Sequence, residues 1–326
     1  MPADRTGVRL RVLMEPRHGA SYDEILALAR ATEQAGFDAF FRSDHLLGVD
    51  PADPTYRPSD SWTTLAGLAR DTERVRLGTL VTAATFRAPA LLAAIVATVD
   101  DMSGGRAELG IGTGWYAKEH AAYGLPFGSA AERFDRLEEA LEIITGLWRH
   151  PAGEGHGFGF TGRHFRVADS ATPPRPVQQP HPPVIVGGTG PKRTPAIAAR
   201  YATEFNAALG SPDDVRARIA VFEQACAAIG RDPAEARRSV LVPVACGATP
   251  AEVERRAAVI GSDFMRAHAV TGSPEEVGER LSALAAAGAD TVYLHVYDIH
   301  DLDHVALLGA EVLPHISPAA LVPQGT

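Results

Sequence analysis

Two polar residues that directly follow a short apolar segment are the first candidates for chemistry. Asp44 and His45, preceded by Ser43, come straight after the predicted strand 38–42, which has an apolar centre. An adjacent carboxylate can orient an imidazole, which can then donate a proton, or a hydrogen bond to a bound ring. A plainer arrangement is equally open, in which Asp44 caps the next turn and His45 faces solvent. We take Asp44 and His45 as candidate catalytic residues.

A glycine-rich segment, 110–116, follows another apolar run and reads Gly-Ile-Gly-Thr-Gly-Trp-Tyr. Its glycines would let the backbone approach a flat ligand closely, while Thr113 and Trp115 offer a hydroxyl and an aromatic wall. The spacing differs from that of a dinucleotide-binding fingerprint, so a Rossmann fold is not indicated. The other interpretation is a tight turn in which Trp115 belongs to the core.

A second glycine-rich segment is a candidate phosphate site. Residues 187–194 follow an apolar run and open a helix, and free N–H groups at a helix start attract anions. Two cations in the segment would add to that attraction. The spacing is not that of a Walker loop, and the alternative is a turn with two exposed cations. The residues assigned to phosphate binding are Gly187, Gly188, Thr189, Gly190, Pro191, Lys192 and Arg193.

Three histidines near the C-terminus, His295, His300 and His304, alternate with aspartates. Metal ligation is conceivable at such spacings. We expect a strand exit and a polar helix start instead, because no ligand set at other strand ends completes a site. No metal is therefore expected.

These residues need a scaffold, and the chain alternates strands and helices along its length. Five helix starts carry a hydroxyl followed three residues later by a carboxylate, which is the capping-box pattern, at Ser21, Ser129, Ser211, Thr249 and Ser273. Eight apolar segments between helices are predicted strands: 8–13, 38–42, 75–81, 107–111, 184–187, 203–207, 239–245 and 291–296. Eight such units predict a (β/α)8 barrel, with a doubly wound open sheet as the alternative.

Composition sets ordinary bounds on the protein. The 326 residues carry a net charge of −9 and two cysteines, which argues against nucleic-acid binding and against a disulfide framework. We find no signal peptide and no apolar run that spans a membrane, so we expect a soluble cytoplasmic protein. We predict a single domain, 1–326, with an insertion at about 151–183. Such a long insertion is typical of a lid, and 162–167 within it is strand-like.

Taken together, the segments around residues 43–45, 79–115, 133–140 and 187–206 resemble the luciferase-like monooxygenase superfamily, in its branch that uses flavin or the deazaflavin coenzyme F420. The resemblance extends from about Val8 to Ala310. It implies a (β/α)8 barrel, a homodimer, and a non-prolyl cis peptide at Leu80–Val81. It also implies that the cofactor ring lies near Asp44, His45, Thr79, Leu80, Val81, Thr113, Gly114 and Trp115, with its phosphate end at the loop 187–193.

The activity that the resemblance implies is hydride transfer between F420 and a small organic substrate. His45 would donate or polarise, Asp44 would orient it or contact the cofactor ring, and Trp115, Tyr116 and His164 would line the substrate pocket. Relatives that oxidise a sugar phosphate carry a carboxylate where this chain has Trp115, which indicates a less polar substrate. The alternatives are an FMN-dependent monooxygenase that uses reduced flavin and O2, and a non-catalytic cofactor-binding protein.

Overall fold

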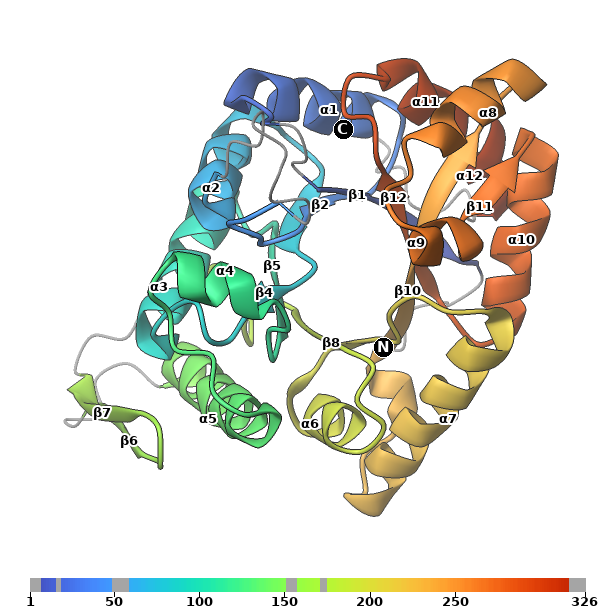
Figure 1. Cartoon of the computed structure of the whole chain (residues 1–326). Coiled ribbons are helices and arrows are strands. Elements are labelled where there is room, and N and C mark those ends of the chain that lie inside the picture. The colour runs from blue at the N-terminus through green and yellow to red at the C-terminus, as the bar shows by residue number, and fades with distance from the viewer. Residues whose placement is uncertain (1–6, 16–18, 49–58, 151–156, 171–174, 317–326) are drawn as a thin grey trace.

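A computed structural model of the chain describes residues 7–15, 19–48, 59–150, 157–170 and 175–316. Eight parallel strands form a closed barrel, because β10 pairs with both β9 and β12 and so joins the two ends of the sheet. Figure 1 shows this ring with helices around its outside. The barrel strands are β1 (Arg9–Met14), β2 (Ala39–Arg42), β3 (Arg76–Thr79), β5 (Ala107–Gly112), β8 (Val184–Gly187), β9 (Glu204–Asn206), β10 (Arg237–Cys246) and β12 (Thr291–Val296). The predicted barrel is confirmed, and all eight predicted strands contribute to it.

The helices follow the strands as a (β/α)8 barrel requires. The longer ones are α1 (Tyr22–Gln34), α2 (Ser61–Asp71), α3 (Pro89–Met102), α5 (Ala130–Arg149), α6 (Arg193–Tyr201), α7 (Pro212–Ala228), α8 (Pro250–Ala258) and α10 (Pro274–Ala286). Shorter segments are α4 (Ala117–Ala122), α9 (Asp263–Ala267), α11 (Leu302–Leu307), α12 (Leu313–Ile316), a 3-10 turn (Pro233–Glu235) and a π-helical turn (Leu308–Val312). Within the described ranges, none of these helices is long and apolar enough to cross a membrane.

The local rules read from the sequence hold at the helix starts. All five predicted capping boxes are present, with the hydroxyl accepting a backbone N–H and the carboxylate reaching back. Proline occupies the first turn of α3, α7, α8 and α10, where its missing N–H costs nothing.

The barrel interior is charged toward the amino ends of the strands. Arg11 is buried and donates to Glu108 at 2.8 Å and to the hydroxyl of Tyr293 at 3.1 Å. Burial by itself would raise the pKa of Glu108, but Arg11 and Arg76 lower it to about 2. An apolar layer that includes Leu13, Phe41 and Ile185 also fills the barrel interior.

Three features depart from the simple alternation. A two-residue strand, β4 (Thr82–Ala83), pairs with β5 just after β3, and β11 (Val270–Gly272) pairs with β10. The insertion contains an antiparallel hairpin, β6 (Phe158–Thr161) and β7 (Arg166–Ser170). The strand expected at 162–167 is therefore only partly right, because 162–165 forms the turn of this hairpin and only Arg166 and Val167 belong to a strand, β7. In Figure 1 the hairpin lies outside α5, away from the barrel opening.

Candidate active site

A cavity of about 540 Å³ opens at the carboxyl ends of the barrel strands. This is the face where (β/α)8 barrels carry their ligands. Its walls bring together most of the residues expected from the sequence, namely Asp44, His45, Leu80, Val81, Thr113, Gly114, Trp115, Gly187, Gly188, Thr189 and Gly190. Thr79, Tyr116, His164, Pro191, Lys192 and Arg193 are not among the residues that line it.

The peptide bond between Leu80 and Val81 is cis, as predicted, and lies between β3 and β4. Glycines surround the Val81 side chain. A Cβ at Gly112 would lie 3.0 Å from Val81 Cγ2, and a Cβ at Gly187 would lie 3.3 Å from Val81 Cγ1. Larger side chains at these two positions would crowd Val81 and narrow the cavity floor.

His45 is held by a carboxylate from another element. Its Nδ1 lies 3.1 Å from Oε2 of Glu119, a residue of α4 that is 1% exposed. The other carboxylate oxygen of Glu119 accepts the N–H groups of Leu46 and Leu47, the latter at 2.9 Å. Glu119 thus holds both the imidazole of His45 and the backbone that follows it.

This contact controls the charge of the imidazole. Burial by itself would lower the pKa of His45, but the hydrogen bond and charge of Glu119 outweigh it and raise the pKa above 6.5, with smaller contributions from Glu15 and Asp44. A histidine with a raised pKa is a proton donor near neutral pH.

Asp44 does not have the role expected of it. Its carboxylate accepts hydrogen bonds from Arg87 Nη1 at 2.6 Å and from Thr82 Oγ1 at 2.8 Å. The hydroxyl oxygen of Thr82 also lies 3.1 Å from that of Thr79, which donates to the carbonyl of Gly110. The expectation that Asp44 orients His45 is corrected, because Glu119 is bonded to the imidazole. Asp44 still lines the cavity, whereas Thr79 is fully buried and does not line it.

Trp115 and Tyr116 form an aromatic pair at the rim. Their rings stack with centroids 5.1 Å apart, and the ring of His45 meets Trp115 edge-on at 5.7 Å. Trp115 is 64% exposed, whereas the hydroxyl of Tyr116 donates to the carbonyl of Gly48. Trp115 therefore lines the cavity, whereas Tyr116 stacks against Trp115 without lining the cavity.

Four side chains pack in a row near α4 and α5, with tilted or edge-on ring contacts. His120 packs against Phe86 at 5.1 Å and Phe127 at 4.7 Å, and the guanidinium of Arg133 lies 3.9 Å over Phe127. Arg133 also donates to the carbonyls of Gly114 and Gly128. Arg133 lines the cavity together with the loop 187–190. A fixed cation thus faces the glycine loop.

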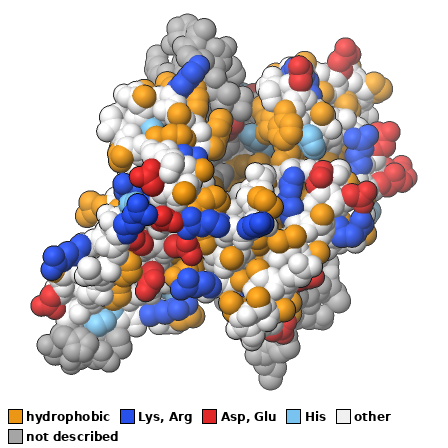
Figure 2. Space-filling model, turned by 60° about the horizontal axis from the view of Figure 1, so that its bottom comes forward, with side chains coloured by type: hydrophobic (Ala, Val, Ile, Leu, Met, Phe, Trp, Pro, Cys, Tyr) orange, Lys and Arg blue, Asp and Glu red, His pale blue; other side chains and the backbone are white. Residues whose placement is uncertain are grey.

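The two cations expected to bind phosphate point elsewhere. Arg193 forms ion pairs with Asp135, at 2.8 Å, and with Glu138, both on α5. Lys192 precedes α6 and its side chain is exposed. The glycines of the loop line the cavity, but this structure does not place Lys192 or Arg193 there. Figure 2 shows positive and negative side chains interspersed over the face that carries α5 and α6.

His164 is likewise outside the cavity. Glu139 of α5 accepts the backbone N–H groups of Arg163, His164 and Phe165, which fixes the hairpin turn to the outside of the barrel. The His164 ring lies 3.9 Å from Asp135. The expectation that His164 reaches over the substrate is therefore not met in this structure.

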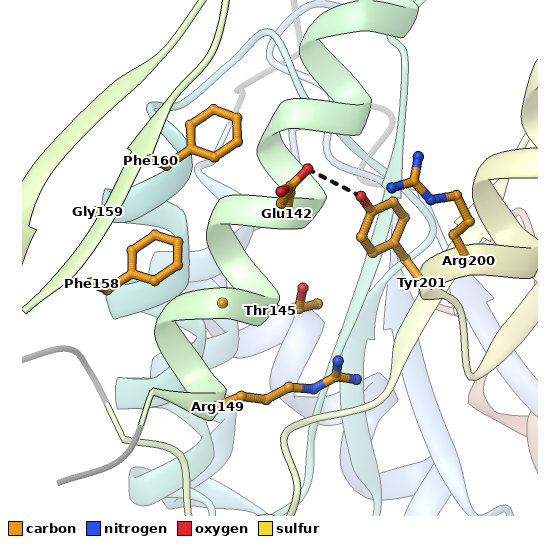
Figure 3. A pocket seen from close by; sticks show the side chains of 9 residues that line it. Glu142, Thr145, Arg149, Phe158, Gly159, Phe160, Arg200 and Tyr201 are labelled. Carbon is orange, nitrogen blue, oxygen red and sulfur yellow. Dashed lines mark hydrogen bonds between the residues drawn. The ribbon is translucent and has the colours of Figure 1, made fainter. Parts of the chain in front are cut away.

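A second cavity of about 390 Å³ lies between α5, α6 and β6, on the outer side of the barrel. Figure 3 shows Phe158 and Phe160 on one side of α5, and Tyr201 on the other, donating to Glu142. It contains none of the residues expected to be functional.

The C-terminal histidines have separate partners. His295 stacks on Tyr297 at 4.1 Å, His304 accepts the N–H of Cys246, and His300 lies 3.7 Å from Glu24. Among the described residues no group of three or more His, Cys, Asp or Glu side chains is placed to hold a metal ion.

Glu119, His120 and Arg133 are site residues that the sequence analysis missed. Glu119 and His120 are adjacent on a six-residue helix, and Arg133 lies in the first turn of α5. Their proximity to the glycine segment 110–116 was the available signal, because residues that follow a barrel strand line the same face.

The fold and the cavity define a (β/α)8 barrel enzyme with its site at the carboxyl ends of the strands. The family model for luciferase-like monooxygenases matches residues 8–262, and the chain belongs to that family. An FMNH2-dependent dimethylsulfone monooxygenase from Pseudomonas putida is 27% identical over 92% of this chain and 90% of its own length.

Two further proteins illustrate the range of relatives. An F420-dependent hydroxymycolic acid dehydrogenase from Mycobacterium tuberculosis is 35% identical over 65% of this chain, and the match spans 56% of that protein. The structure of the coenzyme F420-dependent tetrahydromethanopterin reductase from Methanopyrus kandleri superimposes with a TM-score of 0.77 over 96% of this chain and all of that one, at 21% identity. The last similarity concerns the fold alone.

Proposed function

We propose that this enzyme transfers a hydride between coenzyme F420 and a small organic substrate. One observation carries the proposal. The imidazole of His45, bonded to Glu119, lines the cavity together with a glycine loop and Arg133, which donates to the carbonyl of Gly114. The 35% identity with an F420-dependent dehydrogenase supports the choice of cofactor.

The residues present fit such a cofactor. A cavity of about 540 Å³ lies within the range that small-molecule sites occupy, roughly 300–1,000 Å³. Gly112 and Gly187 leave open the space beside Val81 that a Cβ would enter, so a flat ring could approach the backbone there. Arg133 and the loop 187–190 could hold a phosphate at the other end.

When bound, F420 supplies a ring carbon that gives or accepts a hydride. The protein provides the proton transfer and the surface that holds the substrate. A carbonyl carbon that receives a hydride leaves an oxygen that needs a proton, and His45 is placed to donate it. In the reverse direction, His45 accepts the proton of an alcohol. Trp115 shields the opening and gives an apolar surface for the substrate.

An FMN-dependent monooxygenase remains the second candidate. The relative from Pseudomonas putida, which is FMNH2-dependent, matches 90% of its own length. The glycine cradle and Arg133 would serve FMN equally, because both cofactors join a flat tricyclic ring to a phosphate-bearing tail.

Binding and turnover distinguish the candidates. F420 and FMN are titrated separately into the purified protein, and reduced F420 is then mixed with a panel of small ketones and aldehydes. Our proposal requires saturable F420 binding and oxidation of reduced F420 without consumption of O2. Turnover that needs reduced FMN and O2 would establish the monooxygenase, and tight binding of either cofactor without any turnover would favour a binding protein.

We also propose that the protein forms a homodimer, as the family resemblance implies. Leu91 on α3 is 65% exposed, and it is the single large apolar side chain of that helix that a subunit contact would cover. Sedimentation of the wild type and of Leu91→Glu tests this, and a monomeric wild type would refute it.

A further inference from the structure

A carboxylate that neither the family resemblance nor the named relatives assign lies against the candidate acid. Glu119 of α4 is 1% exposed and makes three contacts that converge on one turn of chain. Oε2 meets His45 Nδ1 at 3.1 Å, and Oε1 accepts the N–H groups of Leu46 and Leu47. Burying a carboxylate without hydrogen-bond partners costs free energy. The N–H groups of the turn offset this cost, and the carboxylate in turn fixes the conformation of the turn.

We propose that Glu119 is the positioning residue of His45, setting its tautomer and keeping a proton on its ring. A carboxylate accepts only, so His45 Nδ1 must carry the proton of the shared hydrogen bond. Nε2 is then the ring nitrogen that exchanges a proton with a substrate. This inference rests on the proposed role of His45, and it adds the group that makes His45 an acid.

The other charged and titratable groups around His45 make weaker candidates. Asp44, next in sequence, is bonded to Arg87 and Thr82. Glu15, after β1, contributes charge to His45 but less than Glu119 does. Trp115 and the Tyr116 ring lie 5.7 and 6.4 Å from the His45 ring and act as neutral neighbours. Glu119 combines contact, burial and charge.

The pair also explains how the barrel keeps its acid in place. His45 follows β2, whereas Glu119 comes from the helix after β5, so the contact joins loops from two different strands. Because Glu119 accepts hydrogen bonds from the backbone of Leu46 and Leu47 as well as from the His45 ring, removal of the Glu119 side chain should loosen the whole turn. An isosteric amide at position 119 keeps the shape and removes the charge.

The test is histidine NMR on the cofactor-free protein, labelled with 15N at histidine. His45→Gln identifies the His45 signal. We expect the wild-type His45 to titrate above pH 6.5, and Glu119→Gln to lower that midpoint by about one unit or more, which is the size of effect that an adjacent opposite charge has. Glu119→Asp should restore part of the shift, since it keeps the charge on a shorter side chain.

Glu139→Gln is the matched control. Like Glu119, Glu139 accepts successive backbone N–H groups, here three of them, but these belong to the hairpin turn outside the barrel. His45 should therefore titrate in Glu139→Gln as it does in the wild type. An unchanged midpoint in Glu119→Gln would overturn the proposal. If that variant does not fold, the wild-type spectrum decides, because a His45 midpoint at or below 6.5 would also overturn it. A raised midpoint that depends on Glu119, in a protein that binds no F420, would refute the proposed function and leave this inference standing.

Discussion

Arg193 Nη2 lies 2.8 Å from Oδ1 of Asp135, so the cation that opens α6 is bonded to α5. Arg193 also contacts Glu138 and lies over the ring of Phe134, 5.0 Å from its centre. Arg193 is therefore paired outside the cavity, whereas Arg133 lines the cavity together with the glycine loop. The distinction leads to a direct test of which cation holds the cofactor phosphate.

Arg133→Ala should weaken cofactor binding at least tenfold. A charge-assisted hydrogen bond contributes roughly 1.5–3 kcal/mol, and its loss should matter less as salt is added. Lys192→Ala is the control and should bind within about twofold of the wild type at moderate salt. Fluorescence titration at two salt concentrations measures both. A larger loss in Lys192→Ala than in Arg133→Ala would return the phosphate site to the residues expected from the sequence.

His45→Ala should separate binding from turnover. The loss of a positioned acid typically costs about 10²–10⁴-fold in rate. Binding of reduced cofactor should change only several-fold, because stacking and the phosphate tail hold the ring. Single-turnover mixing of the reduced enzyme with substrate measures the step. Hydride transfer at the wild-type rate would show that His45 only lines the cavity.

Gly110→Ala should destabilise the barrel. A Cβ at Gly110 would lie 1.9 Å from the carbonyl oxygen of Thr79, which is impossible without movement of β3. We expect a cost of about 1–3 kcal/mol, as for other overpacked cores, seen as a lower melting temperature. Gly278→Ala is the control, because a Cβ there meets nothing within 4 Å and alanine favours the helix by about 0.5–1 kcal/mol. Equal melting temperatures for Gly110→Ala and the wild type would contradict the close strand approach.

His304 should make the protein sensitive to mild acid. Burial, followed by the charge of Arg256, lowers the pKa of His304 to about 4. Because the folded pKa lies below the ordinary value of 6.5, the stability from neutral His304 is complete above pH 6.5. It is lost as the pH falls toward 4, by about 3 kcal/mol in total.

His304→Gln removes this titration and can still accept the N–H of Cys246. The free energy of unfolding, measured by urea denaturation, should therefore fall less between pH 6.5 and 4 in the variant than in the wild type. Parallel pH profiles for the two proteins would show that His304 does not titrate in this range.

Local sequence patterns predicted the scaffold well because each depends on neighbouring residues. The capping boxes at Ser21 and Ser273 need only a hydroxyl and a carboxylate three residues apart, and both form. The strand at 162–167 was predicted on the same local grounds, but only its last two residues lie in a strand, β7. Residues 162–165 form a turn because Glu139, more than 20 residues away in the chain, accepts backbone N–H groups of that turn. A local sequence pattern does not reveal such a distant contact.

The site shows the same division. The predicted strand ends correctly indicated that His45 and the glycine loops lie on one face of the barrel, because the carboxyl ends of parallel strands lie on the same side. The partner of His45 could not be predicted, because Glu119 is 74 residues further along and Asp44 is adjacent. Likewise, nothing local to Arg193 indicates that Asp135 on α5 neutralises it.

The most direct test of the proposed function compares F420 with FMN in the same protein. Both cofactors are titrated into the purified wild type, with Arg133→Ala as the variant that should weaken either one. Quenching of tryptophan fluorescence follows binding, and Trp115 at the rim is one reporter. We predict saturable binding of F420, and oxidation of bound reduced F420 by a small carbonyl compound without consumption of O2. Tighter binding of FMN, with turnover that requires O2, would contradict the account.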